Sequence, residues 1–198
     1  MAEAMRARPG TLQGRFVRLE PLSEAHVEGL TAIGLEDEIW KYMLYGPMRG
    51  QDDIRQWVRD ILARAANGSD LPFAVLDLAS GRVAGATRYL DIRPEHRALE
   101  IGGTWYGSEF QRTAVNTECK YLLLKNAFEQ LGCIRVQLKT DSRNIRSQAA
   151  IERLGAVKEG TLRNHMILPD GTIRHSAYYS ILDAEWPRVK AFLEGRLR

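Results

Sequence analysis

One segment in the middle of the chain combines residue types that bind anions at the start of a helix. Residues 110–116 read Phe-Gln-Arg-Thr-Ala-Val-Asn and stand between an apolar segment and a long helical pattern. A predicted strand leads in, and the free N–H groups of the helix meet there at the positive end of its dipole. This arrangement suits a phosphate or pyrophosphate, although any strand–helix connection has the same outline. A Walker loop is excluded, because no Gly-Lys-Ser or Gly-Lys-Thr follows.

A second candidate for chemistry is a carboxylate inside an apolar stretch. Glu100 lies between Leu99 and Ile101 in a predicted strand, where burial is expected to raise the pKa of its side chain. The alternative is a carboxylate on the solvent face of the strand. No ligand spacing supports a metal site. Three histidines are alternative candidates for the same chemical role as Glu100: His96, His165 and His175. Each lies in a polar or turn-proximal segment, which is more typical of a surface residue or a substrate contact.

Composition bounds the class of protein. The chain has 198 residues with 28 Lys and Arg against 25 Asp and Glu, a net charge of +3, and its pI is about 8.9. This charge suits an anionic ligand but is too weak to indicate nucleic acid. Cys119 and Cys133 form no C-x-x-C pair, which excludes a zinc ribbon or a dithiol motif. Without an apolar run of membrane length or a signal sequence, we expect a reduced, cytoplasmic protein with no membrane or nucleic-acid partner.

The elements that would position these residues follow from the period of the apolar side chains. Residues 1–10 predict a flexible N-terminal leader, which leaves the domain at 11–198. Asn116 and the pair Asp141-Ser142 are expected to cap the two helices that follow them. The order of elements predicts one α+β domain around a mixed, largely antiparallel sheet, with a central strand–helix–strand crossover and flanking helices. The predicted strands are near 15–22, 72–78, 82–92, 97–106, 134–138, 156–168 and 172–182, and the predicted helices are near 27–33, 54–62, 116–131, 145–154 and after 186.

The motifs around the central helix resemble the GNAT superfamily of acyl-CoA-dependent N-acyltransferases. That family carries a Q/R-x-x-G-x-G/A loop for the CoA pyrophosphate, and this chain keeps Gln111 but has Ala114 and Asn116 where smaller residues are usual. The segments 144–156 and 159–182 continue the pattern of the family in the expected order. The resemblance as a whole covers about residues 11–193. The pattern is most like the ribosomal-protein N-terminal acetyltransferase branch. The resemblance implies acetyl-CoA as the acetyl donor.

The same resemblance assigns a strand that pairs with the pantetheine arm of CoA through backbone groups freed by a bulge. Gly102 and Gly103 fit such a bulge, since glycine in a strand often marks one; simple tolerance of glycine is the alternative. Asn144 is expected to bond the pantetheine amide or to initiate its helix. The cofactor-binding residues implied are Ile101, Gly102, Gly103, Thr104, Trp105, Gln111, Arg112, Thr113, Ala114, Val115, Asn116, Asn144 and Ser147.

For catalysis, Glu100 is the expected base that deprotonates the attacking amine, through a water molecule. Many family members place a tyrosine on the second CoA-binding helix to protonate the leaving thiolate, but this chain has Ile151 there. Ser147, one turn earlier, is the expected contact of the CoA sulfur, with a bond to its own helix backbone as the alternative. Backbone N–H groups of 101–106 are expected to stabilise the oxyanion.

Acceptor specificity is expected from the first loop and the last hairpin. Trp40, Tyr42 and Tyr45 offer aromatic walls, although Trp40 could instead seal the core. Further arginines add positive charge, which would suit an acceptor carboxylate: Arg49, Arg88, Arg163 and Arg174.

The sequence therefore predicts an N-acetyltransferase that moves an acetyl group from acetyl-CoA to a primary amine, either a protein N-terminus or a small molecule. The alternatives are a non-catalytic acyl-CoA-binding or sensor module and, less well supported, a nucleic-acid-binding domain. The acceptor stays open among ribosomal N-termini, peptides, amino acids, polyamines and drug amines. The resemblance also makes a homodimer reasonable.

Overall fold

The computed structural model describes residues 5–198. Residues 1–4 of the predicted leader lie outside the described part, so the flexibility of the leader stays a prediction. Within 5–10, Met5 is buried, and its sulfur accepts from the Cys133 thiol at 3.3 Å. This contact joins the start of the described chain to the core.

A single twisted sheet of eight strands, in the order β1-β2-β3-β4-β5-β6-β8-β7, organises the molecule. All neighbours are antiparallel except β5 and β6, which run parallel through the predicted central crossover. The predicted α+β class is therefore confirmed. The strands are β1 (Leu12–Gln13), β2 (Val17–Pro21), β3 (Leu71–Asp77), β4 (Val83–Arg93), β5 (Ala98–Tyr106), β6 (Arg135–Asp141), β7 (Val157–Ile167) and β8 (Ile173–Leu182).

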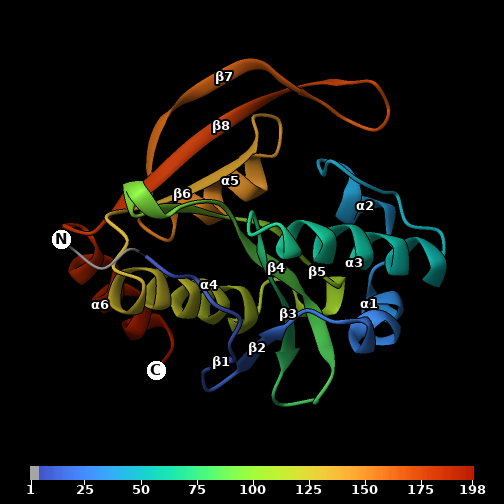
Figure 1. Ribbon diagram of the computed structural model, residues 1–198, viewed down its shortest axis with the longest axis horizontal. Helices are drawn as coiled ribbons and strands as arrows, with labels where there is room; N and C mark the ends of the chain where they lie inside the picture. Colours follow the sequence, from blue (N-terminus) through green and yellow to red (C-terminus); the bar gives the residue numbers. More distant parts are fainter. Residues whose placement is uncertain (1–4) are drawn as a thin grey trace.

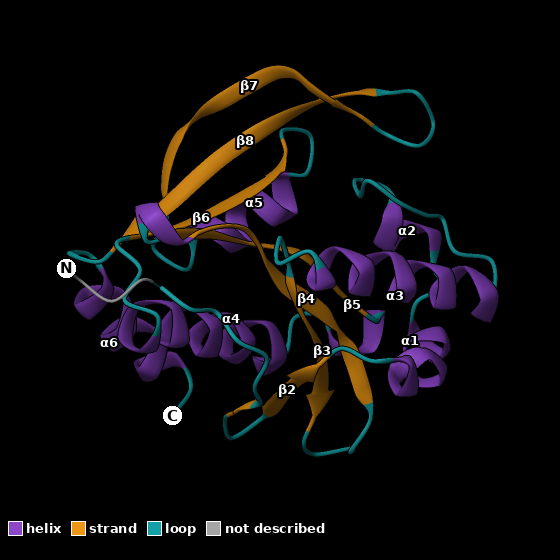
Figure 2. Ribbon diagram, in the orientation of Figure 1, coloured by secondary structure: helices purple, strands orange, loops and turns teal. Residues whose placement is uncertain are grey.

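Helices cover both faces of the sheet (Figures 1 and 2). The first three lie on one side and α4 and α6 on the other, while α5 lies beside β6 and the long β7–β8 hairpin extends away from the rest. The helices are α1 (Val27–Ile33), α2 (Asp37–Trp40), α3 (Gln51–Ala66), α4 (Ala114–Lys125), α5 (Ile145–Glu152) and α6 (Trp186–Arg196).

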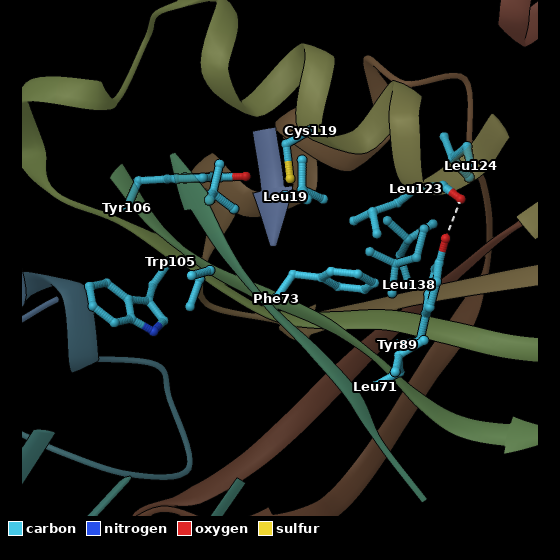
Figure 3. Close-up of a cluster of buried hydrophobic side chains, with 14 of the residues drawn as sticks. Leu19, Leu71, Phe73, Tyr89, Trp105, Tyr106, Cys119, Leu123, Leu124 and Leu138 are labelled. Atoms are coloured by element: carbon cyan, nitrogen blue, oxygen red, sulfur yellow. Dashed lines mark hydrogen bonds between the residues drawn. The ribbon is translucent and has the colours of Figure 1, made fainter. Parts of the chain in front are cut away.

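The two sides of the sheet have different cores. On the α4 side, Tyr89 donates a hydrogen bond from its hydroxyl to the Leu123 carbonyl at 2.6 Å (Figure 3). On the α1–α3 side, an aromatic cluster joins Trp105 of β5 to Trp40 and Trp57, with ring centroids 4.9 and 5.7 Å away. Tyr106, the neighbour of Trp105 in β5, instead lies beside Cys119 of α4 (Figure 3), so β5 contributes alternate side chains to both cores, as a pleated strand must.

Neither Asn116 nor the pair Asp141-Ser142 caps the helix that it was expected to cap. Helix α4 begins at Ala114, because Thr113 is extended and its hydroxyl accepts from the Val115 N–H at 3.2 Å. Asn116 is therefore inside the first turn and is not the cap. Asp141 belongs to β6, and Asn144 caps α5. In both cases the side chain of the residue directly before the first turn provides the cap, by accepting a hydrogen bond from a backbone N–H of that turn.

Candidate active site

Strands β5 and β6 separate in the middle of the sheet. They pair only at Ala98–Arg135, Leu99–Val136 and Glu100–Gln137. Beyond this point β5 continues to residue 106 and β6 to residue 141 without pairing to one another. The backbone groups of 101–106 that face β6 are thus left for another partner, as expected for the pantetheine-binding strand.

The other edge of the same segment contains the predicted bulge. Ala86 pairs with Trp105 and Arg88 with Gly102, so Thr87 alone opposes two residues of β5. One of the two is Gly103, whose φ of +57° is a conformation that favours glycine. A Cβ there would stand 2.9 Å from Arg88 Nε. The bulge therefore explains why the strand needs a glycine at this point.

The loop before α4 is tied to both the sheet and α5. Gln111 donates from Nε2 to the Tyr106 carbonyl at 3.0 Å, and its Oε1 accepts from Arg146 Nη1 at 3.0 Å. Arg112 has a φ of +62° and an exposed side chain. The segment thus holds the open end of α4 beside α5, and an anion at that end would find helix N–H groups.

Glu100 is buried at the point where the strands separate, with 2% of its surface exposed. Its Oε2 accepts from Gln137 Nε2 at 2.8 Å and from Lys139 Nζ at 2.9 Å. The alternative of a solvent-facing carboxylate is therefore wrong, because the Glu100 side chain is buried on the same face of the sheet as Gln137 and Lys139. Among the described residues, Oε1 makes no hydrogen bond. The Lys139 ammonium offsets the buried negative charge.

Of the three candidate histidines, His165 lies nearest this group. Its Nδ1 is 3.0 Å from the Ser176 hydroxyl and its Nε2 is 3.3 Å from the Tyr178 hydroxyl. Burial, followed by the charges of Lys139 and Arg174, lowers its pKa. His96 is exposed beside Glu95 and His175 accepts from a backbone N–H of the hairpin.

The predicted aromatic wall has two parts. Trp40 is 3% exposed and donates from Nε1 to the Gly34 carbonyl at 2.7 Å, so it does seal the core. Tyr45 packs on this cluster, 6.0 Å from the Trp40 and Trp57 ring centroids. The Tyr42 carbonyl accepts from Arg174 Nη1 at 3.1 Å.

Of the four arginines predicted to add positive charge, two are buried and two are exposed. Arg88 and Arg174 are 7% and 6% exposed. Arg49 binds Asp37 at the surface and Arg163 is exposed on β7. The structure therefore brings only Arg88 and Arg174 into the interior.

A groove of about 500 Å³ opens between the α2 region and the tip of the β7–β8 hairpin. Its wall is largely apolar, with acidic residues and a lysine at the rim. The lining residues are Asp37, Glu38, Trp40, Lys41, Met43, Gly46, Pro47, Leu168, Pro169 and Asp170.

On α5, Asn144 accepts the Ser147 N–H with Oδ1 at 3.0 Å. The helix-initiating role expected for Asn144 is thus present, and its amide nitrogen is not used in that bond. Ser147 is partly exposed, and no hydrogen bond of its hydroxyl is found among the described residues. Ile151 is buried, with 8% exposed.

One residue that the sequence analysis missed is Lys120 of α4. It is 7% exposed and donates from Nζ to the Thr104 hydroxyl at 2.5 Å. Thr104 in turn lies 2.7 Å from the Thr87 hydroxyl. Burial lowers the Lys120 pKa to about 8. The available signal was the helical period, since Lys120 lies one turn before Leu123 and Leu124 on the apolar face.

Two kinds of feature are not found in residues 5–198. No helix there is long and apolar enough to cross a membrane. No group of three or more His, Cys, Asp or Glu side chains is placed to hold a metal ion in this range.

Comparisons with known proteins place this geometry in a family. Residues 17–157 match the model of the acetyltransferase (GNAT) domain. The protein named "Putative ribosomal N-acetyltransferase YdaF" of Bacillus subtilis (strain 168) is 31% identical over 113 residues, which cover 57% of this chain and 61% of that relative. A GCN5-related N-acetyltransferase from Brucella melitensis is 30% identical, with a TM-score of 0.92 over 100% of this chain and 90% of its own.

A fold likeness extends to a structure with a ligand. Mycobacterium smegmatis RimJ, solved in complex with CoA-disulfide, has a TM-score of 0.79 at 21% identity, over 96% of this chain and 94% of its own. The suspected kinship with the ribosomal-protein acetyltransferase branch is supported by these names. The family match and the full-length likeness together show that this chain belongs to the GNAT acetyltransferase family.

Proposed function

We propose that this chain is an N-acetyltransferase that moves an acetyl group from acetyl-CoA to a primary amine by direct attack of the amine on the thioester. The observation that carries the proposal is the separation of β5 from β6 beside a buried carboxylate, Glu100. The acceptor in this proposal is a protein N-terminus or a small amine. A cytoplasmic location, a possible homodimer and the absence of nucleic-acid and membrane partners belong to the same proposal.

The described residues fit CoA. The backbone of residues 101–105 is unpaired toward β6, which leaves donors and acceptors for an extended amide chain. Residues 111–116 form the start of α4, where helix N–H groups and the dipole favour a pyrophosphate. The complex of M. smegmatis RimJ with CoA-disulfide supports this class of ligand. When bound, acetyl-CoA supplies the acetyl group as a thioester.

Glu100 would accept the proton of the attacking amine through a water molecule. Its Oε2 is occupied by Gln137 and Lys139, which fixes the carboxylate and leaves Oε1 to accept. A base is most useful for an amine of high pKa, about 10.4 for a lysine side chain against about 8 for an α-amino group. The Gln137 and Lys139 contacts orient the carboxylate and offset its charge.

The leaving thiolate needs a proton donor other than residue 151, because an isoleucine cannot donate. The Ser147 hydroxyl on the preceding turn of α5 is free of hydrogen bonds to described residues and would serve as the contact. Backbone N–H groups of 101–106 would stabilise negative charge on the carbonyl oxygen, since fixed dipoles in a buried site need no reorganisation.

The test is release of free thiol from acetyl-CoA, measured against a broad panel of primary amines. We expect release that depends on the amine, with the acetylated amine detected by mass spectrometry. Tight CoA binding with no amine-dependent release would instead favour the non-catalytic module. A steep loss of DNA or RNA affinity with salt would favour the nucleic-acid alternative.

A further inference from the structure

Two buried arginines approach the site from different strands and contact the same loop, at Tyr42 and Tyr45. Arg88 of β4 places its Cζ 5.8 Å from the Tyr45 ring centroid. Arg174 of β8 bonds the backbone of the same loop at Tyr42. Both lie on the side of the sheet that carries Glu100. Arg88 pairs with Gly102, which lies two residues from Glu100 on the same face of β5. Arg174 shares a face of β8 with Tyr178, the partner of Lys139. The two guanidinium groups therefore approach the loop that carries Tyr42 and Tyr45 from two different strands, beside the proposed site of reaction.

The charges on this side do not balance. Three carboxylates each pair with one cation, in Asp70–Arg88, Glu100–Lys139 and Asp141–Arg143. The remaining cation is Arg174. A carboxylate partner within 4.0 Å is not found for it among residues 5–198.

Within the described chain, the hydrogen bonds of Arg174 go only to neutral groups. Its Nε donates to the Ser176 hydroxyl at 3.0 Å and its Nη1 to the Tyr42 carbonyl. Burial lowers the pKa of Arg174, against the opposing effect of Asp141 and Glu100. Two further titratable neighbours, Tyr178 and His165, stay uncharged near pH 7, because burial raises the pKa of Tyr178 and lowers that of His165. A buried cation of this kind is stabilised by an anion.

Arg88 adds unused donors at the same place. Its Nε stands 3.2 Å from Asp70 Oδ2, yet neither Nε nor Nη1 makes a hydrogen bond within the described chain. Buried donors without partners are unusual and costly in folded proteins. An oxygen-bearing anion would satisfy them, since guanidinium groups match carboxylates in geometry as well as in charge.

We propose that the acceptor amine carries a carboxylate, which Arg174 and Arg88 bind beside the loop of Tyr42 and Tyr45 while the amine faces Glu100. This inference rests on the proposed acetyl transfer and narrows its acceptor class. It favours amino acids or peptides with an acidic side chain near the N-terminus. It disfavours polyamines and other cationic amines, which would bring positive charge toward an unpaired guanidinium.

The experiment compares matched acceptors in which an amide replaces the carboxylate, with rates expressed per unprotonated amine, because an α-carboxylate also raises the pKa of the neighbouring amine. One pair is L-leucine and L-leucine amide, and the other is Ser-Glu-Phe amide and Ser-Gln-Phe amide. Thiol release from acetyl-CoA gives kcat/KM for each acceptor. We expect the wild type to prefer the acid in at least one pair by about tenfold or more, the change expected for one hydrogen bond to a charged group. The pair that shows the preference identifies a free α-carboxylate or an acidic side chain as the source.

Two variants assign the preference. Arg174→Gln is expected to bring the acid-to-amide ratio to about one, and melting curves check that it folds. Arg64→Gln removes the same charge from an exposed position on α3 and is expected to keep the ratio.

Thiol release without a preference in the wild type, or a ratio unchanged in Arg174→Gln, would overturn the carboxylate proposal and leave acetyl transfer standing. Absence of release with every acceptor would overturn both.

Discussion

The two sides of strand β5 bury a lysine in opposite ways. On the acceptor side, Lys139 reaches the Glu100 carboxylate at 2.9 Å, within a group of paired charges. On the α4 side, Lys120 reaches only the Thr104 hydroxyl, and burial lowers its pKa to about 8. The acceptor side therefore holds the charge of its lysine by pairing it with a carboxylate. The α4 side, where the cofactor is proposed to bind, makes the charge of its lysine easier to lose.

This difference matches the two tasks proposed for the strand. Proton transfer from an amine needs an ionised carboxylate, and a nearby cation lowers the cost of burying one. A pantetheine arm is a neutral chain with amide groups, which backbone N–H and C=O groups can bind. Charge is needed on the α4 side only at the N-terminus of the helix, where the pyrophosphate is expected.

Ala114→Glu tests the proposed cofactor side and has the largest expected effect. A carboxylate in the first turn of α4 would compete with phosphate for the helix N–H groups. The dipole would favour the new charge by ~0.3–1 kcal/mol, so folding should survive. We expect a folded protein with no measurable CoA affinity by calorimetry.

The matched control is Ala184→Glu, which places the same charge at an exposed position just before α6. It should bind CoA as the wild type does. Affinity of Ala114→Glu within a few-fold of the wild type would show that the pyrophosphate does not bind at this loop.

Glu100→Gln tests the acceptor side. A general base contributes ~10²–10⁴-fold to a rate, so turnover should fall by that order while the CoA dissociation constant changes little. The measurement is kcat between pH 6 and 9, beside calorimetry with CoA. Wild-type turnover over this range would remove Glu100 from the mechanism.

A double variant separates catalysis from charge balance. Glu100→Gln leaves the Lys139 ammonium unpaired in a site where its side chain is 15% exposed, and an unpaired buried charge is itself destabilising. Adding Lys139→Met removes that charge. Recovery of turnover in the double variant would mean that Glu100 acts only through Lys139, whereas recovery of stability alone would support the proposed base.

The contrast also shows what the sequence could predict. The hairpins, the central crossover and the bulge at Gly103 follow from apolar period, turn residues and glycine, all of which are local signals. The pairing of Glu100 with Lys139 joins residues 39 positions apart and depends on the register of β5 with β6. The ion pair of Asp70 with Arg88 likewise depends on how separate elements pack. Thr113 could not be identified as the cap of α4 for another reason, because that role depends on its extended backbone conformation.

Lys120→Met tests the α4 side, where the buried lysine has no carboxylate partner within the described chain, through the free energy of unfolding. The folded-state pKa of about 8 lies below the usual lysine value of 10.5, so the unfolded chain binds more protons between these values and wild-type stability rises with pH there. The burial penalty is fully present below about pH 8. Methionine has no such penalty, so the variant should be more stable at pH 7 by on the order of 1–3 kcal/mol.

Urea unfolding of both proteins at pH 7, 8, 9 and 10 checks the sign. The stability advantage of Lys120→Met should shrink as the pH rises above 8, because the wild-type lysine loses its charge. The hydroxyls of Thr87 and Thr104 lie 2.7 Å apart and can still bond one another in the variant. An advantage that does not vary with pH would mean that packing, not charge, sets the difference.

Asn144 gives the smallest expected effect and the finest test of the cofactor side. Its Oδ1 caps α5 by accepting the Ser147 N–H, while its amide nitrogen is the proposed donor to CoA. Asn144→Asp keeps the acceptor and loses the donor, whereas Asn144→Ala loses both. The loss of a cap costs ~0.5–2 kcal/mol of stability, and the loss of one hydrogen bond costs ~0.5–1.5 kcal/mol of CoA binding. We therefore expect both variants to bind CoA more weakly by calorimetry and only Asn144→Ala to melt earlier. Unchanged CoA affinity in both variants would assign Asn144 to the cap alone.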